Sequence, residues 1–290
     1  MSNPTIAQTI QTLDPDRDHQ KICHLLAGYE FPWDMTRALE LALLRTFCIP
    51  SIAKLLDRTG QFHHHGQKRY DDTGLIVSKL LQWGYDDPRG AAFLARMNGM
   101  HGRYAIANSD FCYVLSTFIY EPVRWFDRFT WRPLSEIEKQ ALFHFWRNVG
   151  LRMGIQEIPT SYSAFEQFNQ DYEAMHFQYA AQNKRVADAT LQMFLNWFPS
   201  LVRPVLKPGA SALLDEPMRS ALGWPETPEV MKGAIALGLR SRSTIAHWFP
   251  ERKTPDFFAD QRQRSYPQGY QLEDIGPPEM LEELNLNKNP

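Results

Sequence analysis

The segment FCYVLSTFIYEPVRWFDRF, residues 111–129, is a long stretch of mainly apolar and aromatic side chains. Asn108 or Ser109 just before it is a residue type that commonly starts a helix. Pro122 lies inside the segment and predicts a kink. No two neighbouring segments of the chain alternate apolar and polar residues with a period of two, and hairpin signals are absent. The segment therefore predicts a long helix within an all-α protein.

Start and stop signals place further helices on both sides of this segment. Asp71 or Asp72 is expected to cap a helix that runs to Trp83, and Asp87-Pro88 is expected to open the helix that carries His101. Spacings of the capping-box type occur at Ser135–Glu138 and Ser163–Glu166, and apolar periodicity predicts helices at 36–47, 52–56, 184–198, 210–221 and 228–248.

Composition limits the class of protein. The chain has 290 residues, of which 43% are hydrophobic and 13% aromatic, enough for a sizeable core or an apolar ligand cavity. The formal charge of −2 excludes a global basic field, so no nucleic-acid partner is expected. Three widely spaced cysteines form neither a disulfide framework nor a zinc pattern, which predicts a cytoplasmic protein. No signal peptide or spanning segment is evident, so membrane contact would be peripheral.

The chain divides into three parts by composition. Residues 1–34 are expected to form an N-terminal extension that packs on the core. Residues 35–249 read as a single all-α domain, because short connections join long helices. Residues 250–290 are rich in proline, charge and amides, which predicts an extended, partly disordered tail.

His101 lies in RMNGMHGRY, residues 96–104, between Gly99 and Gly102. Glycine destabilises a helix by about 1 kcal/mol relative to alanine, so two glycines there need a reason. One reason is the close approach of a large flat ligand, which a Cβ atom would obstruct. A haem over an axial His101 fits, with Nδ1–H donating to a carbonyl such as that of Met97. From position alone, a core histidine bonded to a carbonyl is the alternative.

Arg69 and Thr73 stand at positions i and i+4 and therefore share one helix face. Arginine carries a fixed charge and a planar fork of donors, which suits a propionate or another polar ligand. The threonine hydroxyl could bond to oxygen. Pairing of Arg69 with Asp72 or a surface carboxylate is the alternative explanation.

These residues resemble a known family. Arg-x-x-(Lys or Asp)-Thr, followed some thirty residues later by a histidine before glycine or alanine, is the pattern of the MpaB and latex-clearing-protein (rubber oxygenase) family. Arg69, Asp72, Thr73 and His101 match it, and Asp72, where rubber oxygenases carry lysine, is similar to the MpaB branch. The resemblance covers about residues 35–200 and, more weakly, 266–270. It implies a globin-like helical fold around haem b, with His101 as the iron ligand. The close approach inferred above adds Gly99 and Gly102 as residues beside the cofactor. It also implies oxidative cleavage of carbon–carbon double bonds in isoprenoid chains.

A catalytic base is not singled out by the sequence. Asp72, Asp57 and Glu121 are candidates without a ranking, although Glu121 is expected to pair with Arg124 or Arg128. Three adjacent histidines at 63–65 cannot all face one ion on a regular element, so they are expected to form a solvated loop segment. The aromatic residues of 111–129 could line a pocket for haem and a lipid-like substrate, although core packing explains most of them equally well. The amphipathic segment 36–56 could touch a membrane surface or admit an apolar substrate, with core burial as the default expectation.

The leading hypothesis is a haem b-dependent oxygenase that uses O₂ to cleave double bonds in a hydrophobic, isoprenoid or lipid-like substrate. Arg69, Asp72 and Thr73 are the candidate catalytic residues, and His101 is the candidate iron ligand. A non-catalytic haem sensor or carrier would use the same His101 without the Arg69–Thr73 pair. In a cofactor-free scaffold, the glycines beside His101 would simply allow close helix packing. Substrate, reaction subtype and oligomeric state are left open by the sequence.

Overall fold

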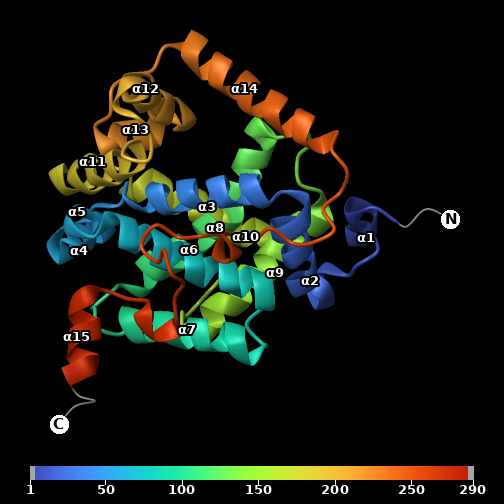
Figure 1. The fold of residues 1–290 in the computed structure, drawn as a ribbon, viewed down its shortest axis with the longest axis horizontal. Helices are drawn as coiled ribbons and strands as arrows, with labels where there is room; N and C mark the ends of the chain where they lie inside the picture. The colour runs from blue at the N-terminus through green and yellow to red at the C-terminus, as the bar shows by residue number, and fades with distance from the viewer. Residues whose placement is uncertain (1–3, 287–290) are drawn as a thin grey trace.

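The computed structural model describes residues 4–286, which form helices with no β-strand among them (Figure 1). The all-α prediction is confirmed. The α-helices are α1 (Ile6–Gln11), α2 (Pro15–Leu25), α3 (Pro32–Thr46), α4 (Pro50–Thr59), α5 (Gln61–His64), α6 (Gly66–Trp83), α7 (Pro88–His101), α8 (Asn108–Phe129), α9 (Glu136–Arg152), α10 (Tyr162–His176), α11 (Ala181–Leu195), α12 (Arg203–Leu213), α13 (Glu216–Leu222), α14 (Glu229–His247) and α15 (Pro278–Leu286).

Helix α8 is the centre of the fold, as its apolar sequence predicts (Figure 1). It packs against α3, α9 and α10, and most of its residues are buried. Gly150 of α9 allows a close approach, because a Cβ atom there would lie 2.3 Å from a methyl group of Leu115. Pro122 lies within the continuous helix. The helix thus forms the wall on which the surrounding helices assemble.

Several helix ends follow the predicted signals, and others do not. Asp87 caps α7, and Ser135 caps α9 in a full capping box. Helix α6 begins at Gly66, so the prediction that Asp71 or Asp72 caps it is wrong. Because the helix runs continuously over 66–83, both aspartates lie inside it; they are buried, and their carboxylates accept hydrogen bonds from Lys68 and the Ser265 amide.

Two further boundaries also differ from the prediction. Ser161, two residues before the predicted Ser163, accepts the capping hydrogen bond of α10 from the Ala164 amide. The single helix predicted for 210–221 is two helices, α12 and α13, because Asp215 takes an extended conformation and caps α13. In both cases a side chain at a nearby position, Ser161 or Asp215, caps the helix and so sets where it begins.

The N-terminal segment joins the same hydrophobic core as the rest of the chain. Ile10, Ile22 and Cys23 are fully buried, and α2 packs along α9. A π-helical turn, Leu26–Glu30, connects α2 to α3. Residues 4–34 therefore help to position α3, which forms part of the site described below.

Residues 250–286 wrap across the body (Figure 1). The Asp256 amide donates to the Gly28 carbonyl at 2.7 Å, and the Ala259 amide donates to Ser78 Oγ at 3.0 Å. Short 3₁₀ turns at Phe258–Asp260 and Leu272–Asp274 lead to α15. These contacts pack the tail on the body; residues 287–290 lie outside the described part of the chain.

Candidate active site

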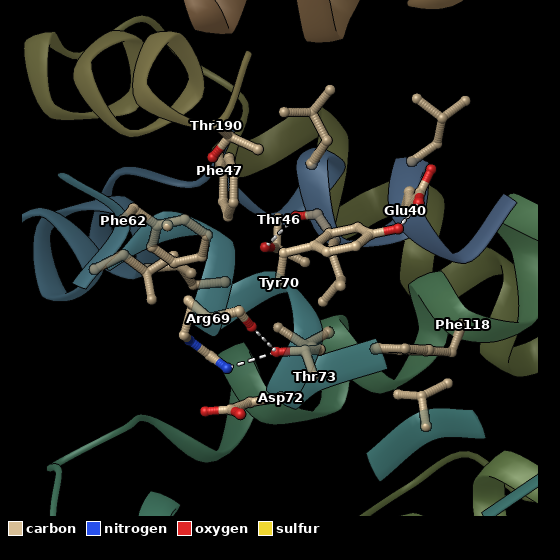
Figure 2. A pocket seen from close by; sticks show the side chains of 18 of the residues that line it. Glu40, Thr46, Phe47, Phe62, Arg69, Tyr70, Asp72, Thr73, Phe118 and Thr190 are labelled. Atoms are coloured by element: carbon tan, nitrogen blue, oxygen red, sulfur yellow. Dashed lines mark hydrogen bonds between the residues drawn. The ribbon is translucent and has the colours of Figure 1, made fainter. Parts of the chain in front are cut away.

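A cavity of about 1080 Å³ lies between the central helix and the helices around it (Figure 2). Ligand pockets usually measure about 300–1,000 Å³, so this cavity has room for a large cofactor together with an apolar substrate. Most of its lining is aliphatic or aromatic. Its walls come from α3, α4, α6, α7, α8, α9, α11, α12 and α14.

Arg69 and Thr73 lie together on the face of α6 that lines this cavity (Figure 2). Arg69 Nη1 donates to Thr73 Oγ1 at 2.6 Å, and the threonine hydroxyl donates to the Arg69 carbonyl at 2.9 Å. The guanidinium also lies 5.7 Å from the Phe62 ring centroid. Burial lowers the pKa of Arg69, and the nearby Asp72 charge opposes this shift. The side chain is enclosed by protein but keeps surface toward the cavity.

Arg69 differs from the other cationic side chains that line the cavity. Arg37 forms an ion pair with Glu40 at 2.6 Å, and Lys68 forms one with Asp72 at 3.0 Å. Arg69 forms no ion pair with any residue in 4–286. An enclosed positive charge without a carboxylate partner is costly unless a ligand or a hydrogen bond compensates it. The geometry therefore leaves Arg69 available to an anionic or polar ligand.

His101 is the last residue of α7, and it lines the same cavity. Burial, and secondarily the Arg69 charge, lowers its pKa to about 4, so the imidazole is neutral at physiological pH. Its ring packs against Phe111 with 5.4 Å between centroids. The expected hydrogen bond from Nδ1 to a carbonyl of α7 is not formed: Nδ1 is buried and has no partner within residues 4–286. His101 is at the end of α7, and its ring packs toward Phe111 of α8, so Nδ1 does not reach the carbonyls of the preceding turn.

Gly99 and Gly102 are exposed, and neither lines the cavity. A Cβ atom on Gly99 would meet nothing within 4 Å, and one on Gly102 would meet only carbonyls of its own helix. The expectation that these glycines let a large flat ligand approach closely is therefore wrong, because neither glycine faces the cavity. Gly102 instead follows the last residue of α7, where glycine is common.

Asp72 lies at the edge of the cavity, where three groups of the protein hold its carboxylate. Lys68 Nζ donates to both oxygens, the Tyr266 hydroxyl donates to Oδ1, and the Gly276 amide donates to Oδ2 at 3.0 Å. Tyr266 and Gly276 belong to the C-terminal tail. Asp72 thus fastens the tail over α6. It follows Arg69 by three residues in the sequence but forms no ion pair with it.

The other two base candidates lie outside the cavity lining. Asp57 pairs with His63 at 3.0 Å and with Arg185 at 2.6 Å, and the Arg185 hydrogen bond lowers its pKa. Glu121 is buried and pairs with Arg124 at 3.3 Å, as predicted, and also with Arg45 at 3.4 Å.

The three adjacent histidines are exposed at the surface and do not form a metal site. His63 and His64 lie in the short helix α5, and His65 precedes α6. No group of three or more potential metal ligands occurs within the described residues 4–286. The solvated position predicted for them is confirmed, in a helical turn and not in a loop.

One polar pair in the cavity was not predicted from the sequence. Tyr70 follows Arg69 on α6 and donates its hydroxyl proton to Glu40 of α3, while Arg37 holds the same carboxylate (Figure 2). Burial raises the pKa of Glu40. The Arg37–Glu40 spacing of three residues was visible in the sequence, but the contact between α3 and α6 was not.

The apolar segments divide between the cavity and the core. Phe111, Phe118 and Trp125 of α8 line the cavity, whereas Tyr113 and Phe126 are buried in the core. In 36–56, the apolar side chains divide between the core and the cavity, so core packing explains only part of this segment. The three cysteines are buried free thiols. None of the helices in 4–286 has the length and apolarity required to span a membrane.

The fold and the cavity together describe a class of protein: an all-helical protein with a large apolar cavity, into which the unpaired Arg69 guanidinium and the neutral His101 imidazole face. Residues 33–240 match the family model described as "ER-bound oxygenase mpaB/B'/Rubber oxygenase, catalytic domain". Because the match covers most of the chain, the chain belongs to this family, and it is an oxidoreductase of the oxygenase type.

Individual relatives agree with this assignment. The chain is 31% identical to "ER-bound oxygenase mpaB" of Penicillium roqueforti over 218 residues, which covers 69% of this chain and 73% of that protein. It is 26% identical to "ER-bound oxygenase mpaB'" of Penicillium brevicompactum over a 341-position alignment, which covers 91% of this chain and 81% of that protein.

Proposed function

We propose that this chain is a haem b-dependent oxygenase that uses O₂ to cleave a carbon–carbon double bond in a hydrophobic, isoprenoid or lipid-like substrate. The observation that carries the proposal is that His101, Arg69 and Thr73, which come from two helices, face one large apolar cavity. Membership of an oxygenase family favours turnover over a haem sensor or carrier.

The residues present fit a haem. His101 has a buried, unpartnered ring nitrogen and is held neutral, and a neutral imidazole is the form that binds iron. Arg69 offers an unpaired cationic fork of the kind that binds a propionate carboxylate. The aromatic and aliphatic lining suits a macrocycle. His101 would hold the iron, and the bound haem would supply the O₂ chemistry.

The protein's own groups have three tasks in this proposal. The apolar walls bind the substrate and exclude water, which strengthens each polar interaction inside. Arg69 would hold either a propionate or a developing negative charge on oxygen. Thr73 fixes the guanidinium through its 2.6 Å hydrogen bond. Adding both oxygen atoms of O₂ across the broken double bond gives two carbonyl groups, so no external reductant is needed.

A spectrum tests the cofactor, and oxygen uptake tests the reaction. Protein reconstituted with haem should show a Soret band that is lost in His101→Ala. Squalene, an isoprenoid with several double bonds, should stimulate oxygen uptake and yield carbonyl products. A Soret band without uptake for any unsaturated lipid would favour the carrier. Absence of the band after reconstitution would refute the haem proposal.

A further inference from the structure

Three carboxylates of residues 4–286 line the large apolar cavity, and two of them are enclosed by the protein. Asp72 accepts hydrogen bonds on both oxygens from α6 and the C-terminal tail. Asp110 accepts them from Ser51 at 3.0 Å and from Tyr172 at 2.7 Å, and it is only 6% exposed. The third carboxylate, Glu40 of α3, differs from both because part of it is left free.

Glu40 uses one carboxylate oxygen for its closest contacts with the protein. Oε1 lies 2.6 Å from Nη2 of Arg37 and accepts the proton of the Tyr70 hydroxyl. Oε2 accepts no hydrogen bond from any residue in 4–286, and it keeps accessible surface. The side chain is 26% exposed, although its surroundings bury it enough to raise the pKa of the carboxyl. The exposed part therefore faces the cavity, and Oε2 is a free acceptor on the cavity wall.

This acceptor lies apart from Arg69. Tyr70 follows Arg69 on α6, and consecutive side chains of a helix point about 100° apart. Figure 2 shows the Tyr70 side chain directed toward Glu40, and the Arg69 side chain directed away from it, toward Thr73. The cavity thus has polar groups in two separate places within a mainly apolar lining, as does a pocket that orients its ligand.

Charge and hydrogen-bonding capacity decide which ligand group fits Oε2. Arg37 balances the charge of Glu40, so the pair does not attract a charged ligand. An ammonium group would be repelled by Arg37, and a carboxylate by Glu40. A carbonyl or ether oxygen has no proton to donate to Oε2. A hydroxyl group is neutral and donates, and a hydrogen bond from a hydroxyl to a carboxylate is short and strong.

We propose that Glu40 binds a hydroxyl group of the ligand, so that the substrate is an unsaturated apolar chain that carries an alcohol. Arg37 and Tyr70 are positioning residues, because they hold Oε1 and leave Oε2 directed into the cavity. The bound hydroxyl then fixes which part of the chain lies beside Arg69 and His101. That this ligand is a substrate rests on the proposed function, whereas the binding of an alcohol does not.

Calorimetric titration of the full chain with matched ligands tests the site without turnover. Farnesol should bind roughly 10- to 150-fold more tightly than farnesyl methyl ether, which has the same chain but no donor, since a hydrogen bond to a charged group is lost. Farnesylamine should bind no more tightly than farnesol, because Arg37 balances Glu40. Equal binding of alcohol and ether to the unmodified protein, or tighter binding of the amine, would overturn the proposal without any variant.

Glu40→Gln tests whether Oε2 is the acceptor. Glutamine has one oxygen, which Tyr70 would occupy, and an NH₂ group that only donates, so the variant should bind the ether as tightly as the alcohol. Asp110→Asn is the matched control, because it makes the same change in another carboxylate of the cavity lining, and it should keep the preference for farnesol. Melting temperature and helical content establish that both variants are folded. A preference that survives Glu40→Gln, or that Asp110→Asn abolishes, would contradict the assignment.

Oxygen uptake separates recognition from chemistry in the haem-loaded protein. Glu40→Gln should raise KM for farnesol and change kcat little, because the hydroxyl is bound but does not react. An equal fall in kcat for alcohol and ether would place Glu40 in the reaction itself and overturn the proposal. The two proposals fail separately: alcohol preference without a Soret band would remove only the oxygenase, and squalene-stimulated uptake with equal binding of alcohol and ether would remove only the hydroxyl site.

Discussion

Arg45 and Arg69 both lie inside the protein, but their surroundings differ. Arg45, at the end of α3, donates to both oxygens of Glu173 at 2.7 Å and to Asp215 at 2.7 Å, and it lies 3.4 Å from Glu121. Arg69 donates to one threonine hydroxyl and faces the cavity.

The pKa values follow this difference. Burial lowers the pKa of Arg45, but the bond to Glu173 and the neighbouring carboxylates more than reverse the effect, so the net pKa is raised. For Arg69, burial dominates and the net pKa is lowered. Arg45, whose charge is neutralised within the fold, joins several helices, whereas the charge of Arg69 has no carboxylate partner in residues 4–286 and stays accessible from the cavity. The four predictions below test this distinction.

The largest effect is expected for Arg45→Ala. The change removes the bidentate partner of Glu173 and one of the two arginines beside the buried Glu121, so the free energy of unfolding should fall by about 3–5 kcal/mol. Denaturant unfolding measures this loss. Arg17→Ala, which removes an exposed ion pair with Asp14, is the control and should cause no measurable loss. A small loss for Arg45→Ala would mean that the network is not structural.

Arg69→Ala should show the opposite profile. Stability should change little, because the lost hydrogen bond to Thr73 is offset by removal of an enclosed, unpaired charge. Haem affinity or turnover should fall by roughly 10- to 150-fold, the equivalent of about 1.5–3 kcal/mol for a charged hydrogen bond. Arg69→Lys keeps the charge but not the fork, so it should recover only part of the function. A stability loss like that of Arg45→Ala would break the comparison.

A pH titration tests the neutral imidazole on the cavity side. His101 has a pKa of about 4 in the folded protein against an ordinary value of 6.5, so the unfolded chain binds the proton more tightly. Stability from this group is therefore present above pH 6.5 and is lost as pH falls toward 4. The apo protein should lose about 2 kcal/mol more than His101→Phe between about pH 7 and pH 5. Parallel curves for the two proteins would show that the imidazole is not enclosed.

Residues that stand in short motifs could be singled out from the sequence, whereas contacts between distant segments could not. Arg69, Thr73 and His101 stand in two short motifs, and α6 and α7 bring them to one cavity. The Arg45 network was not predicted, because its carboxylates come from α8, α10 and the start of α13, and only packing makes them neighbours. The contact between Tyr70 and Glu40 was hidden for the same reason.

The glycines beside His101 illustrate the remaining error. A glycine in a helix signals missing side-chain volume, but the sequence does not say which face of the helix lacks it. On α7, His101 faces the cavity, and Gly99 is exposed on another side. The orientation of the last turn of α7 depends on contacts with α8, such as that between His101 and Phe111, which no local pattern encodes.

The smallest effect is expected for Gly99→Ala, because Gly99 is exposed and lies outside the cavity lining. The added methyl group meets nothing within 4 Å, and Gly99 lies inside α7, so helix propensity alone should act. The free energy of unfolding should rise by about 0.5–1 kcal/mol, since alanine restricts the unfolded chain more than glycine does. Haem affinity should stay unchanged, as measured by titrating haem into the apo protein. Reduced haem affinity in a stabilised Gly99→Ala variant would show that Gly99 lies near the bound haem after all, and that the binding site includes the exposed side of α7.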